Sequence, residues 1–128
     1  MSKEMEKARA IREDTDRHYN CAQAVVCAFA EKAGIDEEKA YQLTAHFGSG
    51  MRMGATCGAI TGGMMVLGLL GKDDPSTLKQ FVDVFRRNHD NLLDCKELLR
   101  VNAERGGEKK PHCDAMVYEA VEALEAVL

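Results

Sequence analysis

The fold is decided by residues 57–70, which read CGAITGGMMVLGLL and form the most apolar stretch of the chain. A helix drawn through this stretch has apolar side chains on all faces, so it must be buried among other helices. It is too short to span a membrane, which takes about 20 apolar residues. One face of this helix carries only small residues, which are Gly58, Ala59, Gly62 and Gly63. We therefore expect a core helix that a second helix approaches closely.

The sequence on both sides of this stretch also has a helical pattern. Apolar residues recur at spacings of three and four, and only two prolines interrupt them. The pattern predicts helices over residues 3–17, 21–33, 36–46, 57–70, 75–88, 95–105 and 113–128. A glycine-rich loop at 48–54 leads into the core helix. We expect an all-α fold, a compact bundle of six or seven helices around a buried central helix, in a single domain covering residues 1–128.

Composition excludes several classes of protein. A net charge of −4 without a long basic run argues against a nucleic-acid surface. The first six residues, MSKEME, are too charged for a signal peptide. We expect a cytoplasmic protein with no membrane insertion. In a reducing compartment its five cysteines would stay mostly as thiols, which favours redox or metal chemistry over a structural disulfide framework.

Four of the cysteines share a position in the pattern. Cys21, Cys57, Cys95 and Cys113 each follow, directly or within two residues, a residue that favours a helix start. The positive end of a helix favours thiolate over thiol, so we expect these cysteines to have lowered pKa values and to act as nucleophiles or metal ligands. Cys27, in the middle of a predicted helix, is expected to pack in the core.

Three functions are compatible with this placement. The leading one is a thiol/disulfide redox protein with an activity like that of a thiol-disulfide oxidoreductase. We expect Cys57 to be the reactive thiolate and Cys21 its resolving partner, with Cys95 and Cys113 as a second pair. Four cysteines allow three pairings, so the connectivity stays open. The partner would be a redox protein or a small thiol.

The second function is a metal centre, zinc or an iron–sulfur cluster, ligated by the same four cysteines. Their wide separation matches no local zinc or ferredoxin pattern, so the fold would have to assemble the site. His18 and His112, which lie beside candidate cysteines, are possible further ligands or proton acceptors. The third function is a structural or interaction domain in which the cysteines only pack, as free cysteines often do.

The motif CGAITGG at residues 57–63, with one cysteine before it and two after it, resembles the C_GCAxxG_C_C family of suspected redox-active proteins. The chain carries the motif in the CGAxxG form, and Cys21, Cys57, Cys95 and Cys113 take the four cysteine positions in order. The resemblance implies a small soluble protein with a redox role and an association with a transport system.

Overall fold

Helices make up most of the part of the chain that the structure describes, residues 2–128 of this computed structural model. They are α1 (Lys3–Glu13), α2 (Cys21–Ala33), α3 (Glu37–Leu43), α4 (Gly58–Leu69), α5 (Pro75–Asn88), α6 (Cys95–Glu104) and α7 (Lys109–Val127). Residues 2–128 contain no β-strand beyond one isolated bridge. The predicted all-α bundle is confirmed. None of the helices in these residues has the length and apolar content needed to cross a bilayer.

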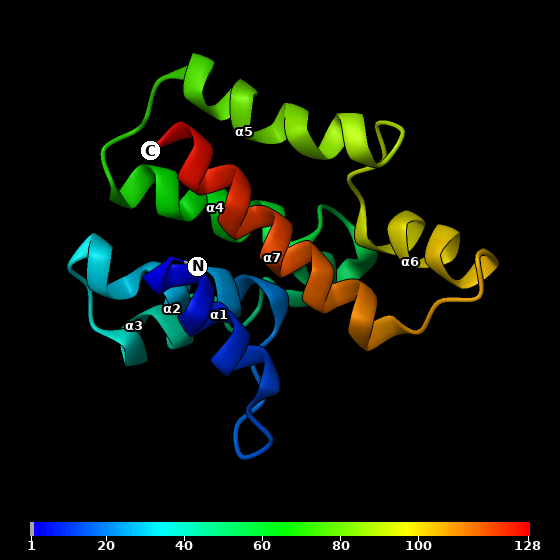
Figure 1. The fold of residues 1–128 in the computed structure, drawn as a ribbon, viewed down its shortest axis with the longest axis horizontal. Helices are drawn as coiled ribbons and strands as arrows, with labels where there is room; N and C mark the ends of the chain where they lie inside the picture. Colours follow the sequence, from blue (N-terminus) through cyan, green and yellow to red (C-terminus); the bar gives the residue numbers. More distant parts are fainter. Residues whose placement is uncertain (1) are drawn as a thin grey trace.

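The helices pack around two long elements, α2 and α7. In Figure 1, α7 runs diagonally across the molecule, with α5 on one side and α1, α2 and α3 on the other. It contacts α1, α2, α4, α5 and α6. The helix α2 contacts α1, α3, α4 and α7. Segments far apart in the sequence therefore share one core.

The helices α2 and α4 form the closest pair in the core. Every residue from Ala22 to Ala30 of α2 is buried. A Cβ atom at Gly58 would lie 3.1 Å from the Ala22 nitrogen, and one at Gly62 would lie 3.1 Å from the Ala22 Cα. Because both positions lack a side chain, the start of α2 rests directly on α4. The expected close approach is confirmed, and α2 is the helix that makes it.

An adjoining side of α4 meets α5 and then solvent, so Gly63 does not share the contact that Gly58 and Gly62 make with α2. Gly63 lies against the ring of Phe81, which is fully buried in α5. Met64 and Leu69 are 37% and 39% exposed. The helix lies in the core as expected, but one edge reaches the surface because α5 covers only part of this side.

Two helices end earlier than the pattern predicts. The helix α1 ends at Glu13 because Asp14 turns to an extended conformation. The Asp14 carboxylate accepts the backbone N–H of Asp16 at 2.8 Å, a local bond that competes with the helix. The helix α3 ends at Leu43. The sequence pattern predicts an apolar stripe of Met5, Ala8, Ala10 and Ile11 on this helix; the structure buries Met5, Ala8 and Ile11 and leaves Ala10 exposed.

The last helix begins earlier than predicted, at Lys109 instead of near Cys113. Pro111 lies in its first turn, where backbone N–H groups have no partner within the helix, so the proline costs no hydrogen bond. The residue therefore does not mark the boundary. As a result Cys113 lies in the second turn of α7, not at its start.

The glycine-rich loop before α4 forms an ordered left-handed turn over Gly50–Gly54. Ser49, Met51 and Arg52 have φ values of 52°, 58° and 60°. Each such non-glycine residue costs about 1–2 kcal/mol. The Ala55 N–H closes the turn by donating to the Gly50 carbonyl at 3.0 Å. The loop delivers the chain to Cys57 in a defined conformation.

Candidate functional site

Cys57 and Cys95 are brought together by a short antiparallel pairing of the segments that precede α4 and α6. Thr56 and Asp94 lie opposite each other in this bridge. The Cys57 N–H donates to the facing segment at 2.8 Å, and the Cys95 N–H donates back at 2.6 Å. Successive side chains of an extended segment point to opposite sides. Because Cys57 and Cys95 each follow a residue of the bridge, their side chains point to the same side. Cys57 is the N-cap residue of α4 and Cys95 is the first residue of α6.

Cys21 begins α2, which is held by a buried capping box. The Asn20 side chain accepts the Gln23 N–H at 2.7 Å, and the Gln23 side chain accepts the Asn20 N–H at 2.8 Å. The Asn20 amide also donates to the Thr44 carbonyl at 3.3 Å. A Cβ atom at Gly58 would lie only 3.3 Å from the Cβ of Cys21. The small residues of α4 thus place Cys21 beside the start of α4, where Cys57 lies.

Cys113 approaches from α7 and lies next to a buried ion pair. The Arg12 Nε of α1 donates to Asp114 at 2.6 Å, and the Arg12 side chain is only 9% exposed. Arg12 also donates to the Tyr19 carbonyl at 2.8 Å. Lys110 lies 3.0 Å from the same Asp114 carboxylate. This ion pair holds α1 against α7 and keeps a guanidinium close to Cys113.

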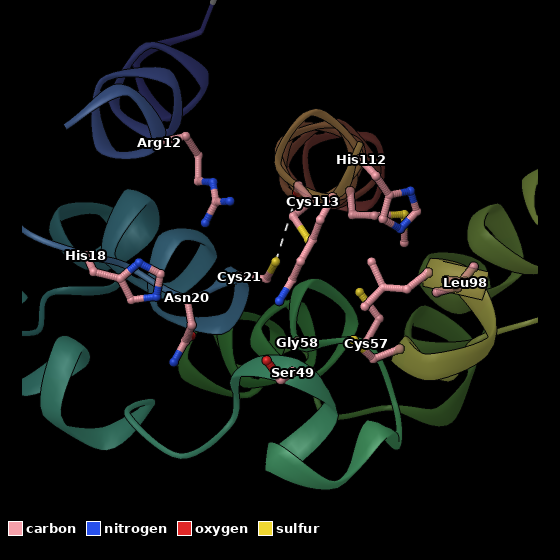
Figure 2. Close-up of a pocket in the computed structure, with 14 residues that line it drawn as sticks. Arg12, His18, Asn20, Cys21, Ser49, Cys57, Gly58, Leu98, His112 and Cys113 are labelled. Carbon is pink, nitrogen blue, oxygen red and sulfur yellow. Dashed lines mark hydrogen bonds between the residues drawn. The ribbon is translucent and has the colours of Figure 1, made fainter. Parts of the chain in front are cut away.

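All four predicted cysteines line one cavity of about 110 Å³, which we call the thiol cavity. Its chemically active lining residues are Arg12, His18, Cys21, Cys57, Cys95, Lys109, His112 and Cys113. Figure 2 shows Cys21, Cys57 and Cys113 around it, with Arg12 reaching in from α1. The fifth cysteine, Cys27, lies in the core, where its thiol donates to the Glu37 carbonyl at 3.7 Å. The expected separation of Cys27 from the other four is confirmed.

Cys21 and Cys113 form a hydrogen-bonded pair in this cavity. The Cys21 thiol donates to the Cys113 carbonyl oxygen at 3.9 Å, and it can donate to the Cys113 sulfur when that sulfur is a thiolate. That bond, with the charges of Arg12 and Lys109, lowers the pKa of Cys113 to about 7, against the opposing effect of burial. The same bond and burial raise the pKa of Cys21. Cys113 is the member that loses the proton because it is less buried and lies near more cations.

Cys57 and Cys95 have the opposite tendency. Burial raises the pKa of Cys57 to about 12, although the backbone N–H groups of Ala59 and Ile60 favour its thiolate. Burial and the nearby Cys113 raise the pKa of Cys95. The expectation that a helix start lowers the pKa of Cys57, Cys95 and Cys21 is therefore wrong. Desolvation outweighs the helix end at Cys57 and Cys95, and the hydrogen bond with Cys113 together with burial does so at Cys21. The lowered pKa belongs to Cys113, which is not at a helix start.

Arg12 and Lys109 were not predicted from the sequence as residues of the site, although the position of each in the helical pattern indicates that it faces the site. Arg12 follows Met5 and Ala8 at helical spacing, so it lies on the apolar face of α1. Lys109 precedes Cys113 by one helical turn, which becomes visible once α7 is seen to begin at Lys109. His18 and His112 line the thiol cavity, and burial lowers the pKa of His112.

The geometry of the site bears on the alternative of a metal centre. Within residues 2–128, no three side chains of His, Cys, Asp or Glu converge closely enough to hold a metal ion. The sequence-based alternative of zinc or an iron–sulfur cluster thus has no ligand cluster among the described residues, although the four thiols share a cavity.

Comparison with known families agrees with the cysteine pattern. The profile of the family described as "Putative redox-active protein (C_GCAxxG_C_C)" matches residues 19–127. The chain belongs to this family. The matched residues contain all four thiols of the cavity, whereas Arg12 lies outside them. No curated protein and no solved structure matches the chain.

Proposed function

We propose that the protein is a thiol-disulfide oxidoreductase in which Cys113 is the attacking thiolate and Cys21 is the resolving thiol. The observation that carries this proposal is the contact of these two cysteines, through the hydrogen bond from the Cys21 thiol to the Cys113 carbonyl, in a cavity with Arg12 and Lys109. A thiol with a pKa near the ambient pH combines a large thiolate fraction with good nucleophilicity. Cys113 is the one cavity cysteine whose pKa is lowered, to about 7.

The reaction balances as a two-electron exchange. The Cys113 thiolate attacks one sulfur of a substrate disulfide, forms a mixed disulfide and releases the first substrate thiolate. Cys21 then loses its proton to that thiolate and attacks the Cys113 sulfur. A Cys21–Cys113 disulfide forms and the second substrate thiolate leaves. The substrate disulfide is reduced, the protein dithiol is oxidised, and the reverse sequence oxidises a substrate dithiol.

Cys57 and Cys95 supply a second dithiol on the far side of the cavity. They flank the Thr56–Asp94 bridge. When ionised, Cys57 raises the pKa of Cys21, and Cys95 raises the pKa of Cys57. In our proposal the Cys95 thiol, once deprotonated, attacks the Cys21–Cys113 disulfide, and Cys57 completes the exchange. The two electrons pass to Cys21 and Cys113, and a Cys57–Cys95 disulfide remains. The external electron donor would be a redox partner protein or a small thiol.

The proposal is tested by mapping the first disulfide formed. Reduced protein is treated with excess hydroxyethyl disulfide, quenched in acid, alkylated under denaturing conditions and digested for mass spectrometry. We expect a linked peptide pair containing Cys21 and Cys113, with Cys27 alkylated. The Cys27→Ala variant should give the same pair, and Cys113→Ser should give none with Cys21. Five alkylated thiols, or a first disulfide joining Cys21 to Cys57, would overturn the assignment.

A further inference from the structure

A second cavity adjoins the thiol cavity and shares Cys113 with it. It measures about 330 Å³, at the lower end of the range for small-molecule sites. Its ionisable lining residues beside Cys113 are Arg12, Asp14, Arg17, His18, Tyr19, Lys109 and Lys110, and we call it the basic cavity. Four of these side chains are permanent cations in a chain whose net charge is −4. The cavity is therefore locally positive in a protein that is negative overall.

The cations of the basic cavity are only partly neutralised. One carboxylate, Asp114, serves both Arg12 and Lys110. Lys109 forms no salt bridge within residues 2–128. Asp14 also lines the cavity, and the four cations still outnumber the three carboxylates Asp14, Glu38 and Asp114. Positive charge is therefore left over on the side of the cavity that faces Cys113.

The opposite wall is held rigidly by a paired cation. Arg17 donates to both carboxylate oxygens of Glu38 at 2.9 Å and lies 3.4 Å over the ring of Tyr41. The Tyr41 hydroxyl donates to the His18 carbonyl at 2.7 Å. These contacts fix the cavity wall that carries Arg17 and His18 against α3, and they leave Lys109 as the cation available to a ligand.

We propose that the basic cavity binds the carboxylate of a small anionic disulfide or thiol and so brings the sulfur of that compound to Cys113. This inference rests on the proposed function, and it names the substrate class. A carboxylate on Lys109 would place a neighbouring disulfide beside the Cys113 sulfur, which attacks it and releases one thiolate. The part of the substrate left in the mixed disulfide keeps its carboxylate on Lys109 until Cys21 resolves it. The cations also concentrate anions that the rest of the surface repels.

The test compares two disulfides that differ in charge. The rate of the first thiol reaction is measured with dithiobis(nitrobenzoate), which is dianionic, and with dithiodipyridine, which is neutral. Substoichiometric reagent is used in a Cys27→Ala background, and the adduct is located by mass spectrometry. The ratio of the anionic to the neutral rate cancels any change in the thiolate fraction of Cys113. Lys109→Gln is compared with Lys72→Gln, which removes the same charge from an exposed lysine that lines neither cavity.

We expect Lys109→Gln to lower the ratio by about three- to tenfold, the effect of one partly screened charge. Lys72→Gln should leave the ratio unchanged, and high salt should abolish the difference between Lys109→Gln and the parent protein. S-methylglutathione, which carries carboxylates but no thiol, should slow iodoacetamide labelling of Cys113 less in Lys109→Gln than in the parent. Reaction at Cys113 with equal ratios in both lysine variants would overturn the anion site and leave the proposed function standing. Failure of Cys113 to react with either disulfide would overturn both.

Discussion

The core and the thiol cavity hold the same side chain in surroundings that give it opposite chemistry. Cys27 lies in the middle of α2, where burial raises the pKa of its thiol to about 12. Cys113 is also partly buried, yet its pKa falls to about 7 because Cys21 donates to it and two cations face it. Burial acts on both thiols in the same direction. The difference therefore comes from the partners that the fold places around Cys113, and burial by itself predicts only an inert cysteine.

The largest expected effect is on alkylation rate. At pH 7 about half of Cys113 is thiolate, while a pKa of about 12 leaves about one Cys27 in 10⁵ ionised. Iodoacetamide labelling followed by peptide mass spectrometry should therefore show Cys113 reacting faster than Cys27 by on the order of 10²-fold or more, because the lower nucleophilicity of the Cys113 thiolate offsets part of its larger ionised fraction. The Cys113 rate should rise with pH around a midpoint near 7. A midpoint close to 9 for Cys113 would show that the cations and Cys21 do not act as described.

The next largest effect is on stability, and it comes from disturbing the contact between α2 and α4 that supports the thiol cavity. A Cβ atom added at Gly62 would lie 3.1 Å from the backbone of Ala22, so Gly62→Ala should destabilise the fold by about 1–3 kcal/mol in urea unfolding. Gly68 lies in the same helix with nothing within 4 Å of an added Cβ. Gly68→Ala should stabilise by about 0.5–1 kcal/mol, because alanine is the better helix former. Equal effects of the two substitutions would contradict the close packing of α2 on α4.

The smallest effect is a pH dependence of stability in the reduced protein. The pKa of Cys113 is lower in the folded state than in the unfolded chain, so folding favours its thiolate. Its stabilising contribution is present above pH 9 and is lost as the pH falls through about 7. After allowance for its partial exposure to solvent, we expect about 1 kcal/mol, measured by urea unfolding between about pH 6 and about pH 8.5 with reductant present.

Two comparisons check this assignment. The Cys113→Ser variant should lose the rise in stability, whereas Cys27→Ala should keep it. The raised pKa of Cys21 works in the other direction, and lowers stability as the pH climbs above 9. A Cys113→Ser variant with the same rise as the parent protein would assign it to a different group.

Much of the fold was predictable because it follows from local patterns. The apolar residues 57–70 and the small residues Gly58 and Gly62 identified the core helix and its close contact. The start of α2 at Cys21 and its end before Gly34 also agree with the structure, because a capping box and a left-handed glycine are local features. The start of α7 was missed because Pro111 is as compatible with a first turn as with a linker.

The sequence by itself determined that this is an all-α protein, which one of its five cysteines is separate from the other four, and which family it belongs to. Periodicity, caps and motif order act over a few residues, so they can be read without a structure. Only the tertiary structure decided which thiol ionises. The pKa of a buried thiol depends on the charges and hydrogen bonds around it. Lys109 is a neighbour of Cys113 in α7, but Arg12 of α1 and Cys21 of α2 are distant from Cys113 in sequence. They reach it only when α1, α2 and α7 pack together.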